Sequence, residues 1–193
     1  MSSWQRPTAE MEVALGRMAA TAPSDRLGPI EGVMVKSLVV HADQRGLFTE
    51  QLRRGDLDDA GLPFVPEHGF AQMSRSLAFA RGGNPPELIK AFHWHRLQWD
   101  YWDFVQGDVR VVLVDLRPGS KTCGRTQVLI AGERQPKVIA IPPLVAHGYQ
   151  VLSLRDVLLC YYVTEPYRAE DPDEGRIPWN DPRIGFDWSV DNI

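Results

Sequence analysis

Apolar residues near the start of the chain recur at intervals of about one helical turn. The stripe consists of Met11, Leu15 and Met18, which fall on one face of a helix. Pro7 and Thr8 stand before it, and both residue types are common where a helix begins. We therefore predict a helix over residues 7–20 that packs through this stripe on the outside of the domain or on a partner subunit.

Beyond Ile30 the pattern changes to short segments rich in β-branched and aromatic residues. Gly, Pro, Asp and Asn separate them, as turns separate strands. The expected strands are residues 33–41, 47–53, 69–79, 88–95, 102–107, 109–116, 125–132, 136–142, 147–154 and 157–164. Such a series is typical of an all-β sandwich or barrel. The one other helical turn that we expect spans residues 56–63.

The composition changes again at Tyr167, after which Pro, Asp, Glu and Trp dominate. We expect these residues to form an irregular strap across the barrel rather than a second domain. The predicted organisation is an N-terminal helical extension, residues 1–30, followed by a barrel with its C-terminal strap, residues 31–193. The length of 193 residues suits one domain with an extension.

Charge and cysteine content exclude several classes of protein. The formal net charge is -4 and the pI is about 5.7, which provides no basic surface for nucleic acid or an anionic membrane. The first residues include acids and lack the apolar segment of a secretory signal, and no apolar run is long enough to cross a bilayer. Cys123 and Cys160 lack the spacing of a disulfide framework or zinc site. We expect a cytoplasmic protein.

Three of the five histidines lie in two strand-and-turn segments. His93 and His95 occupy alternate positions of one predicted strand, so both side chains point to the same side. His147 belongs to a second segment of similar character. A closed barrel has room for one small ligand, so these histidines are candidates for a ligand site. With the carboxylate of Asp100 they form a four-ligand set suited to Fe, Mn, Ni or Zn.

The spacing of these residues resembles the two signature motifs of the cupin superfamily. The motifs read His93-x-His95-x4-Asp100-x6-Gly107 and Pro142-x3-Ala146-His147. The resemblance implies an all-β fold, the cupin-type double-stranded β-helix or jelly-roll barrel, with a short N-terminal helix added here. Many cupins use the same histidines as acid-base groups without a metal, so both kinds of site remain open.

Six further blocks occur in one fixed order between Glu31 and Trp188. They are Asp43-x-Arg45-Gly46-x-Phe48-x-Glu50, Phe70-x-Gln72-x-Ser74-x-Ser76, Lys90-Ala-Phe-His93, Val114-Asp115-Leu116-Arg117 with Ser120 and Thr122, Ile141-Pro142 with Ala146-His147-Gly148, and Glu174-Gly175-x-Ile177 with Trp179-Asn180-Asp181-Pro182 and Ile184-Gly185. Together they resemble the dTDP-4-dehydrorhamnose 3,5-epimerase family. The family consists of cupin-fold isomerases that act on nucleotide-linked 4-keto-6-deoxy sugars.

This resemblance implies catalytic roles for three residue types. Inverting a carbon next to a ketone requires a base that removes its proton and an acid on the other side that returns one. The resemblance places the base at His93 and the acid at Tyr161. Tyr162 is the alternative acid, because adjacent strand residues face opposite ways. Lys90 is placed to stabilise the enolate oxygen.

The resemblance also assigns contacts with the sugar or the nucleotide. These residues are Arg45, Glu50, Gln72, His95, His147, Tyr167 and Glu174. The implied ligand is a nucleotide-linked keto sugar used for a cell-surface polysaccharide or a glycosylated natural product. We expect no cofactor, no bound metal, and no nucleic-acid or membrane partner. The family pattern further implies a homodimer with exchanged N-terminal strands.

The partner of the predicted base differs from the family pattern. There, an aspartate beyond the stretch that matches Ile184-Gly185 pairs with the catalytic histidine, and the nearest acid in this sequence is Asp191. We expect His95 or Asp100 to orient His93 in its place.

Three functions are compatible with these residues. The first is epimerisation of a nucleotide-linked 4-keto-6-deoxy sugar at C3, C5 or both. The second is a metal-dependent isomerase or oxygenase with His93, His95, Asp100 and His147 as ligands. The third is a non-catalytic protein that binds a sugar nucleotide.

Overall fold

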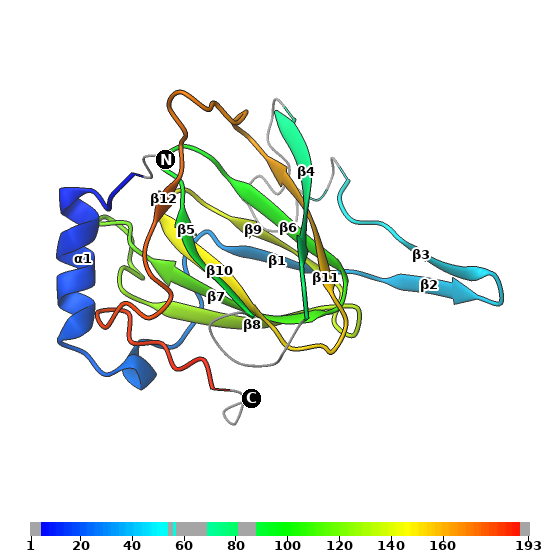
Figure 1. Cartoon of the computed structure of the whole chain (residues 1–193), viewed down its shortest axis with the longest axis horizontal. Coiled ribbons are helices and arrows are strands. Elements are labelled where there is room, and N and C mark those ends of the chain that lie inside the picture. The colour runs from blue at the N-terminus through cyan, green and yellow to red at the C-terminus, as the bar shows by residue number, and fades with distance from the viewer. Residues whose placement is uncertain (1–4, 54–55, 57–68, 81–87, 190–193) are drawn as a thin grey trace.

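The computed structural model describes residues 5–53, 56, 69–80 and 88–189, and two packed sheets with one α-helix outside them dominate it (Figure 1). The helical segments are α1 (Ala9–Ala19) and the 3-10 turn η1 (Pro23–Arg26). The strands are β1 (Met34–Ser37), β2 (Val40–Asp43), β3 (Gly46–Thr49), β4 (Gln72–Ala78), β5 (Ile89–Trp94), β6 (Asp100–Gln106), β7 (Asp108–Asp115), β8 (Thr126–Gly132), β9 (Lys137–Ile141), β10 (Val145–Val151), β11 (Val157–Val163) and β12 (Gly175–Arg176).

The two larger sheets are antiparallel and have five strands each. One has the order β1-β9-β6-β11-β4 and the other the order β12-β5-β10-β7-β8. Neighbouring strands are often distant in sequence, as in a jelly roll whose chain crosses repeatedly between its sheets. The predicted all-β barrel with a short N-terminal helix is confirmed.

Strand β7 shows how the hydrophobic pattern fits this arrangement. Val109, Val111 and Leu113 pack in the core between the sheets. Val112 and Val114 belong to a second apolar cluster on the other face of the same sheet. Every residue of β7 is buried because α1 and the strap cover that outer face. The continuous apolar run therefore reflects a strand covered on both sides.

Helix α1 is fixed to the outer face of this sheet by the predicted stripe. The hydroxyl oxygen of Thr8 accepts a hydrogen bond from the backbone N–H of Met11 at 3.3 Å and caps the helix. Met11, Leu15 and Met18 are all buried in the outer cluster. The predicted helix is confirmed over residues 9–19, and its packing partner is a sheet of its own chain.

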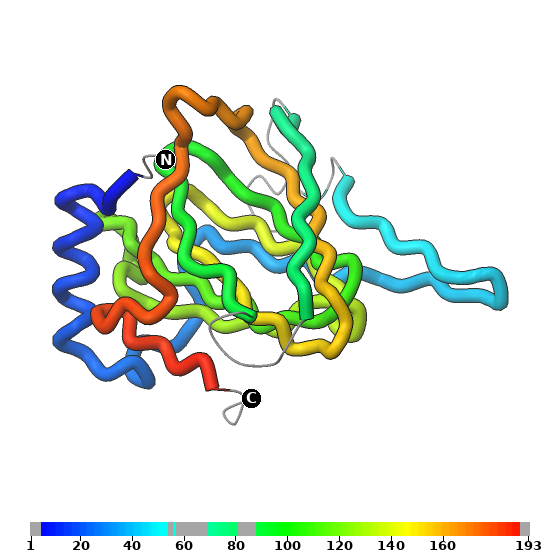
Figure 2. The backbone as a smooth tube through the Cα atoms, viewed as in Figure 1, coloured from blue at the N-terminus to red at the C-terminus, as the bar shows by residue number. Residues whose placement is uncertain are grey.

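The C-terminal strap, residues 167–189, has irregular structure apart from the two residues of β12. It runs beside β5 and then returns near α1 (Figure 2). Ile184 and Trp188 enter the same apolar cluster as α1, and Arg183 pairs with Glu12 of the helix. The helix and the strap therefore cover the outer face of the sheet together.

Strands β2 and β3 form a hairpin that projects away from the two sheets (Figures 1 and 2). Val40, Leu47 and Phe48 are exposed on it. The strand expected over residues 33–41 is divided into β1 and β2, and the one expected over 47–53 ends at Thr49, so those boundaries were wrong. The helical turn expected over residues 56–63 lies outside the described residues except for Asp56.

The sequence predicts no membrane-spanning segment and no disulfide or zinc site at the two cysteines. Within the described part of the chain, no helix is both long and apolar enough to cross a membrane. Cys123 and Cys160 are free thiols.

Candidate active site

A cavity of about 360 Å³ lies between the two sheets, with strap residues in its wall. The cavity is lined by Gln72, Ser76, Lys90, His93, His95, Gln98, Asp100, Trp102, His147, Tyr149, Leu159, Tyr161, Val163, Pro166, Tyr167, Asp173, Glu174 and Arg176. Eight of the ten predicted site residues are among them. The structure therefore brings together side chains from strands of both sheets and from the strap.

Three of these residues form a buried cluster around the carboxylate of Asp100. The Nε2 atom of His147 lies 3.2 Å from an Asp100 oxygen, and Nε2 of His95 lies 3.6 Å from the same oxygen. The Nδ1 atoms of the two rings face backbone carbonyls, that of His147 at 2.9 Å from Val145 O and that of His95 at Asp173 O. A carbonyl only accepts, so each Nδ1 donates and each Nε2 is turned to the carboxylate.

The protonation of this cluster follows from its charges. Burial raises the pKa of Asp100, but the adjacent His95 and His147 outweigh burial and hold that pKa well below its usual range. Burial lowers the pKa of His95, but the charge of Asp100 and its hydrogen bond raise it to about 9. At neutral pH the cavity wall therefore contains an Asp100 carboxylate paired with a His95 imidazolium.

His93, on β5 two positions before His95, has a different environment. Burial, followed by the charges of His147 and Arg176, lowers the pKa of His93 to about 3. Its Nδ1 atom lies 3.6 Å from a carboxylate oxygen of Glu174, which also accepts a hydrogen bond from Arg176 Nε at 3.1 Å. His93 is therefore a neutral imidazole at neutral pH and is available as a base.

Lys90 lies on β5 three positions before His93. Its ammonium group donates hydrogen bonds to Ser76 Oγ and to Leu77 O, both at 3.1 Å. Burial lowers the pKa of Lys90, and burial raises the pKa of nearby Tyr149 to about 12. This part of the cavity therefore offers a cation, a hydroxyl and a phenol to a polar ligand.

The two candidate acids lie on opposite faces of β11. Tyr161 lines the cavity. Tyr162 faces the outside of the sheet, where its hydroxyl donates to the side-chain oxygen of Gln51 and its ring contacts Phe70. Of the two, only Tyr161 is placed to exchange a proton with a ligand in the cavity.

Gln72 and Tyr167 are joined at the cavity wall. The side-chain oxygen of Gln72 accepts a hydrogen bond from the backbone N–H of Tyr167 at 3.1 Å. The Tyr167 side chain is exposed, so it lies at the cavity mouth.

Arg45 and Glu50 do not line this cavity. Arg45 lies at the tip of the projecting hairpin, where its guanidinium pairs with Asp43 at 2.6 Å. Glu50 follows β3 and pairs with Arg53. Within one chain these two residues form exposed ion pairs, and the structure does not bring them to the predicted site.

Several lining residues were missed by the sequence reasoning. They are Ser76, Gln98, Trp102, Tyr149, Asp173 and Arg176. Strand alternation could have identified two of them, because Tyr149 follows His147 by two positions and Trp102 follows Asp100 by two. Asp173 and Arg176 belong to the strap, where no periodicity indicates which side chains face the cavity.

The structure also allows a test of the predicted metal ligands. One donor atom from each of His95, Asp100 and His147 lies within 4.8 Å of the others. Two imidazoles and a carboxylate fit a divalent transition metal, and the Nδ1 hydrogen bonds are of the kind that orient metal-bound histidines. His93 is not in this group and lies next to Glu174 instead. Three of the four predicted ligands are therefore suitably placed.

Comparisons with known proteins are consistent with this geometry. Residues 28–193 match the family model described as dTDP-4-dehydrorhamnose 3,5-epimerase. The chain is 45% identical over 162 residues to the spore coat polysaccharide biosynthesis protein SpsL of Bacillus subtilis, which covers 84% of this chain and 98% of that protein. It is 30% identical over 166 residues to the dTDP-4-dehydrorhamnose 3,5-epimerase of Methanothermobacter thermautotrophicus, covering 85% and 83%.

Among solved structures, the fold is similar to that of NovW, a 4-keto-6-deoxy sugar epimerase from the novobiocin gene cluster of Streptomyces spheroides. The TM-score is 0.71 at 26% sequence identity, and the match covers 84% of this chain and 77% of that one. The cupin-type barrel predicted from the two histidine motifs is confirmed by this likeness.

Proposed function

Since this chain belongs to the dTDP-4-dehydrorhamnose 3,5-epimerase family, we propose that it inverts C3, C5 or both in a nucleotide-linked 4-keto-6-deoxy sugar held in this cavity. The chain is an isomerase of the sugar-nucleotide epimerase type. One observation carries the assignment of residues: His93 and Tyr161 line one cavity from opposite sheets. A base and an acid so placed can address opposite faces of a sugar ring.

In the proposed reaction, His93 removes the proton from the carbon next to the C4 ketone. The electron pair of the broken C–H bond forms the enolate double bond, and the carbonyl π electrons move to the ketone oxygen. Tyr161 then donates its phenol proton to the other face of the same carbon, and the ketone re-forms. The neutral state of His93 at neutral pH supports its role as the base.

Two cations are available to the enolate oxygen. Lys90 and the His95 imidazolium both line the cavity, and a charge fixed before the reaction stabilises an oxyanion without reorganisation. Asp100 does not repel the enolate strongly, because its oxygen is already paired with His95 and His147. Its role in this proposal is to keep His95 protonated.

The proposal includes a cytoplasmic homodimer. The exposed apolar residues of the β2–β3 hairpin, such as Leu47 and Phe48, suit a contact with a second copy. In such a dimer the hairpin would bring Arg45 and Glu50 to the partner's cavity and its nucleotide. We expect a dimer by analytical ultracentrifugation, and we expect Arg45→Ala to raise KM with little change in kcat. A monomer with full activity would contradict this part.

The decisive experiment is proton NMR in deuterated water with a dTDP-4-keto-6-deoxy sugar and chelator-treated enzyme. We expect the C3 signal, the C5 signal or both to wash out, and His93→Ala to slow this exchange by about 1,000-fold while the protein stays folded. Tyr161→Phe should allow exchange but slow inversion. Equal exchange rates in the wild type and His93→Ala would refute His93 as the base.

A metal-dependent isomerase or oxygenase is the second candidate, because His95, Asp100 and His147 present three suitable donors. It predicts that chelation stops the reaction and that Mn²⁺ or Fe²⁺ restores it. Exchange that is indifferent to chelator supports the first candidate.

A further inference from the structure

The carboxylate nearest to the proposed base belongs to the strap. Among the described residues, Glu174 is the acid with an oxygen within ion-pair distance of His93, at 3.6 Å from Nδ1. Asp100 instead pairs with His95 and His147. The expectation that His95 or Asp100 orients His93 therefore finds no contact in the structure.

Strand pairing determines where Glu174 lies. In the pairing of β12 with β5, Arg176 stands opposite His93 and Gly175 opposite Trp94. Side chains two positions apart share a face, so Glu174 and Arg176 both reach the cavity. A Cβ atom at Gly175 would overlap the Trp94 indole, so the absence of a side chain there allows the close approach.

A second segment pairs with the other edge of β12. The backbone N–H of Gln5 donates to Glu174 O at 3.2 Å, and the N–H of Arg176 donates to Gln5 O at 3.4 Å. The Gln5 side chain donates to Pro172 O at 3.0 Å. Gln5 lies four residues before α1, and the buried stripe of α1 holds the helix against the sheet. We call these contacts of Gln5 the brace. Gln5 lies outside residues 28–193, the part of the chain that matches the family.

The strap is also fixed on the side of His95. The carboxylate of Asp173 accepts hydrogen bonds from three successive backbone N–H groups, those of Arg96, Leu97 and Gln98, at 2.8 to 3.0 Å. Glu174 therefore directly follows Asp173, which is anchored by its side chain. The backbone carbonyl of Glu174 itself accepts a hydrogen bond from Gln5. Its carboxylate has little freedom to leave His93.

We propose that Glu174 is a positioning residue that orients His93 and stabilises its protonated form, and that Gln5 of the N-terminal extension holds Glu174 in place. The inference rests on the proposed function, in which His93 acquires a proton. An imidazolium in a buried site needs a nearby negative charge, and a carboxylate on the far ring nitrogen provides both charge and orientation. The Glu174 oxygen that faces His93 also accepts a hydrogen bond from Arg176, which fixes the carboxylate in this position.

The first test compares Glu174→Gln with Glu174→Asp and the wild type. We expect Glu174→Gln to lower kcat and the isotope exchange rate by about 100-fold with KM changed less than about threefold, because the amide keeps the shape and loses the charge. Glu174→Asp should restore part of kcat. A raised KM with unchanged kcat would make Glu174 a substrate contact and overturn the inference.

The second test addresses the brace with a matched pair of variants. Gln5→Pro removes the N–H that bonds Glu174 O, whereas Gln5→Ala removes only the side-chain bond to Pro172. We expect about a tenfold loss of kcat in the first and less than about a twofold loss in the second. In Glu174→Gln the proline should cause no further loss, since both changes act through one carboxylate. If Gln5→Pro lowers kcat by the same factor in Glu174→Gln as in the wild type, the role of the brace is refuted.

The outcomes separate this inference from the function on which it depends. If His93→Ala leaves isotope exchange intact, the proposed function fails. If His93→Ala stops exchange and Glu174→Gln does not slow it, only the role of Glu174 fails.

Discussion

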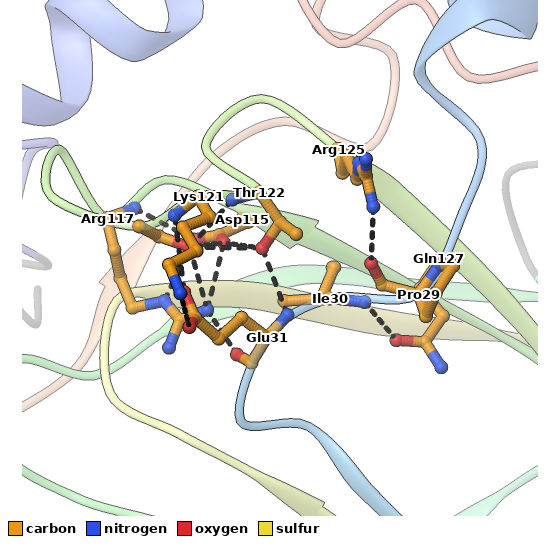
Figure 3. Close-up of polar contacts among 10 residues, drawn as sticks. Pro29, Ile30, Glu31, Asp115, Arg117, Lys121, Thr122, Arg125 and Gln127 are labelled. Atoms are coloured by element: carbon orange, nitrogen blue, oxygen red, sulfur yellow. Dashed lines mark hydrogen bonds and ion pairs between the residues drawn. The ribbon is translucent and has the colours of Figure 1, made fainter.

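Two buried aspartates, Asp115 and Asp100, show how similar burial leads to different roles. Asp115 is 0% exposed and Asp100 is 4% exposed. Asp115 ends β7 and is bonded by Arg117, Ser120 and Thr122, all within seven positions of it (Figure 3). The partners of Asp100, which begins β6, are His147 of β10 and His95, which directly follows β5; β5 and β10 belong to the other sheet.

The Asp115 cluster is complete without a ligand. Arg117 donates to both carboxylate oxygens at 2.9 Å, and the hydroxyls of Ser120 and Thr122 each donate at 2.6 Å. Thr122 in turn accepts from the backbone N–H of Glu31 at 3.0 Å, which ties the chain before β1 to this corner (Figure 3). The cluster therefore joins two segments of the fold and leaves little acceptor capacity for anything else.

The Asp100 cluster faces the cavity, and its partners are titratable. Its carboxylate is paired with two histidines that themselves line the cavity. Burial of a carboxylate therefore does not by itself distinguish a structural group from a functional one. The distinction lies in whether its partners are neighbours in sequence that satisfy it or distant groups exposed to a ligand.

The largest expected effect is on stability, from Asp115→Ala. Removing this carboxylate leaves Arg117 and two hydroxyls without their acceptor, which should lower the free energy of unfolding by about 3–5 kcal/mol. Urea unfolding measures the loss, and activity per folded molecule should stay within about twofold. If Asp115→Ala lowers the free energy of unfolding less than Asp100→Ala does, Asp115 is not the more structural of the two aspartates.

The complementary change, Asp100→Asn, should reduce catalysis as well as stability. The neutral amide no longer stabilises the His95 imidazolium, so we expect kcat to fall about 100-fold, equivalent to about 2.7 kcal/mol in the barrier. At about pH 7 the free energy of unfolding should also fall, by up to about 2.5 kcal/mol, because the stabilisation that comes with the raised His95 pKa is lost. Kinetics and urea unfolding on the same preparation check both halves, and full kcat at neutral pH would be evidence against a charged His95.

The pH dependence of stability sharpens the same contrast. The pKa of His95 is raised from 6.5 to about 9 in the folded protein, so between these values the folded state binds more protons than the unfolded state. The stabilisation is complete below 6.5 and is lost as pH rises through about 9, with a slope of up to about 1.4 kcal/mol per pH unit. Asp100→Asn should flatten this slope, whereas Asp115→Asn should retain it.

A third buried aspartate offers the smallest effect. Burial raises the pKa of Asp103 to about 6, although a hydrogen bond from Gln51 opposes the rise. The folded state therefore favours the protonated acid, and stability falls as pH rises from about 4 to about 6. Asp103→Asn should raise the free energy of unfolding by about 2 kcal/mol at about pH 8 and by almost nothing at about pH 4. Thermal unfolding at both pH values measures this; destabilisation at the higher pH would contradict it.

The sequence predicted the barrel from local spacing, whereas most of the site residues were predicted from the resemblance of its ordered blocks to one family. Alternation along the strands places His93 and His95 on one face, and the helical stripe identifies the covered side of the sheet. The same alternation separates Tyr161 from Tyr162 once the orientation of β11 is known. These features are repeated over several residues, which makes them detectable without a structure.

The remaining features could not be predicted because no repeated pattern encodes them. The resemblance places Glu174 at the site, but its contact with His93 depends on the path of an irregular strap and on Gln5, 169 positions earlier. Arg45 and Glu50 lie on a hairpin whose partner is not part of the same chain in the proposed dimer. His95 and Asp100, the expected partners of His93, are close to it in sequence, whereas Glu174, the partner proposed above, lies across a strand pair.

The double covering of β7 has a consequence for motion. Its backbone is hydrogen-bonded on both edges, by β10 and β8, and both of its faces are buried. Amide protons at Val111 to Leu113 can therefore exchange with solvent only when the whole domain unfolds, whereas those of the exposed hairpin exchange through small local openings. Strand β10, which is buried throughout and pairs with β7 along its length, carries His147 and should share this protection.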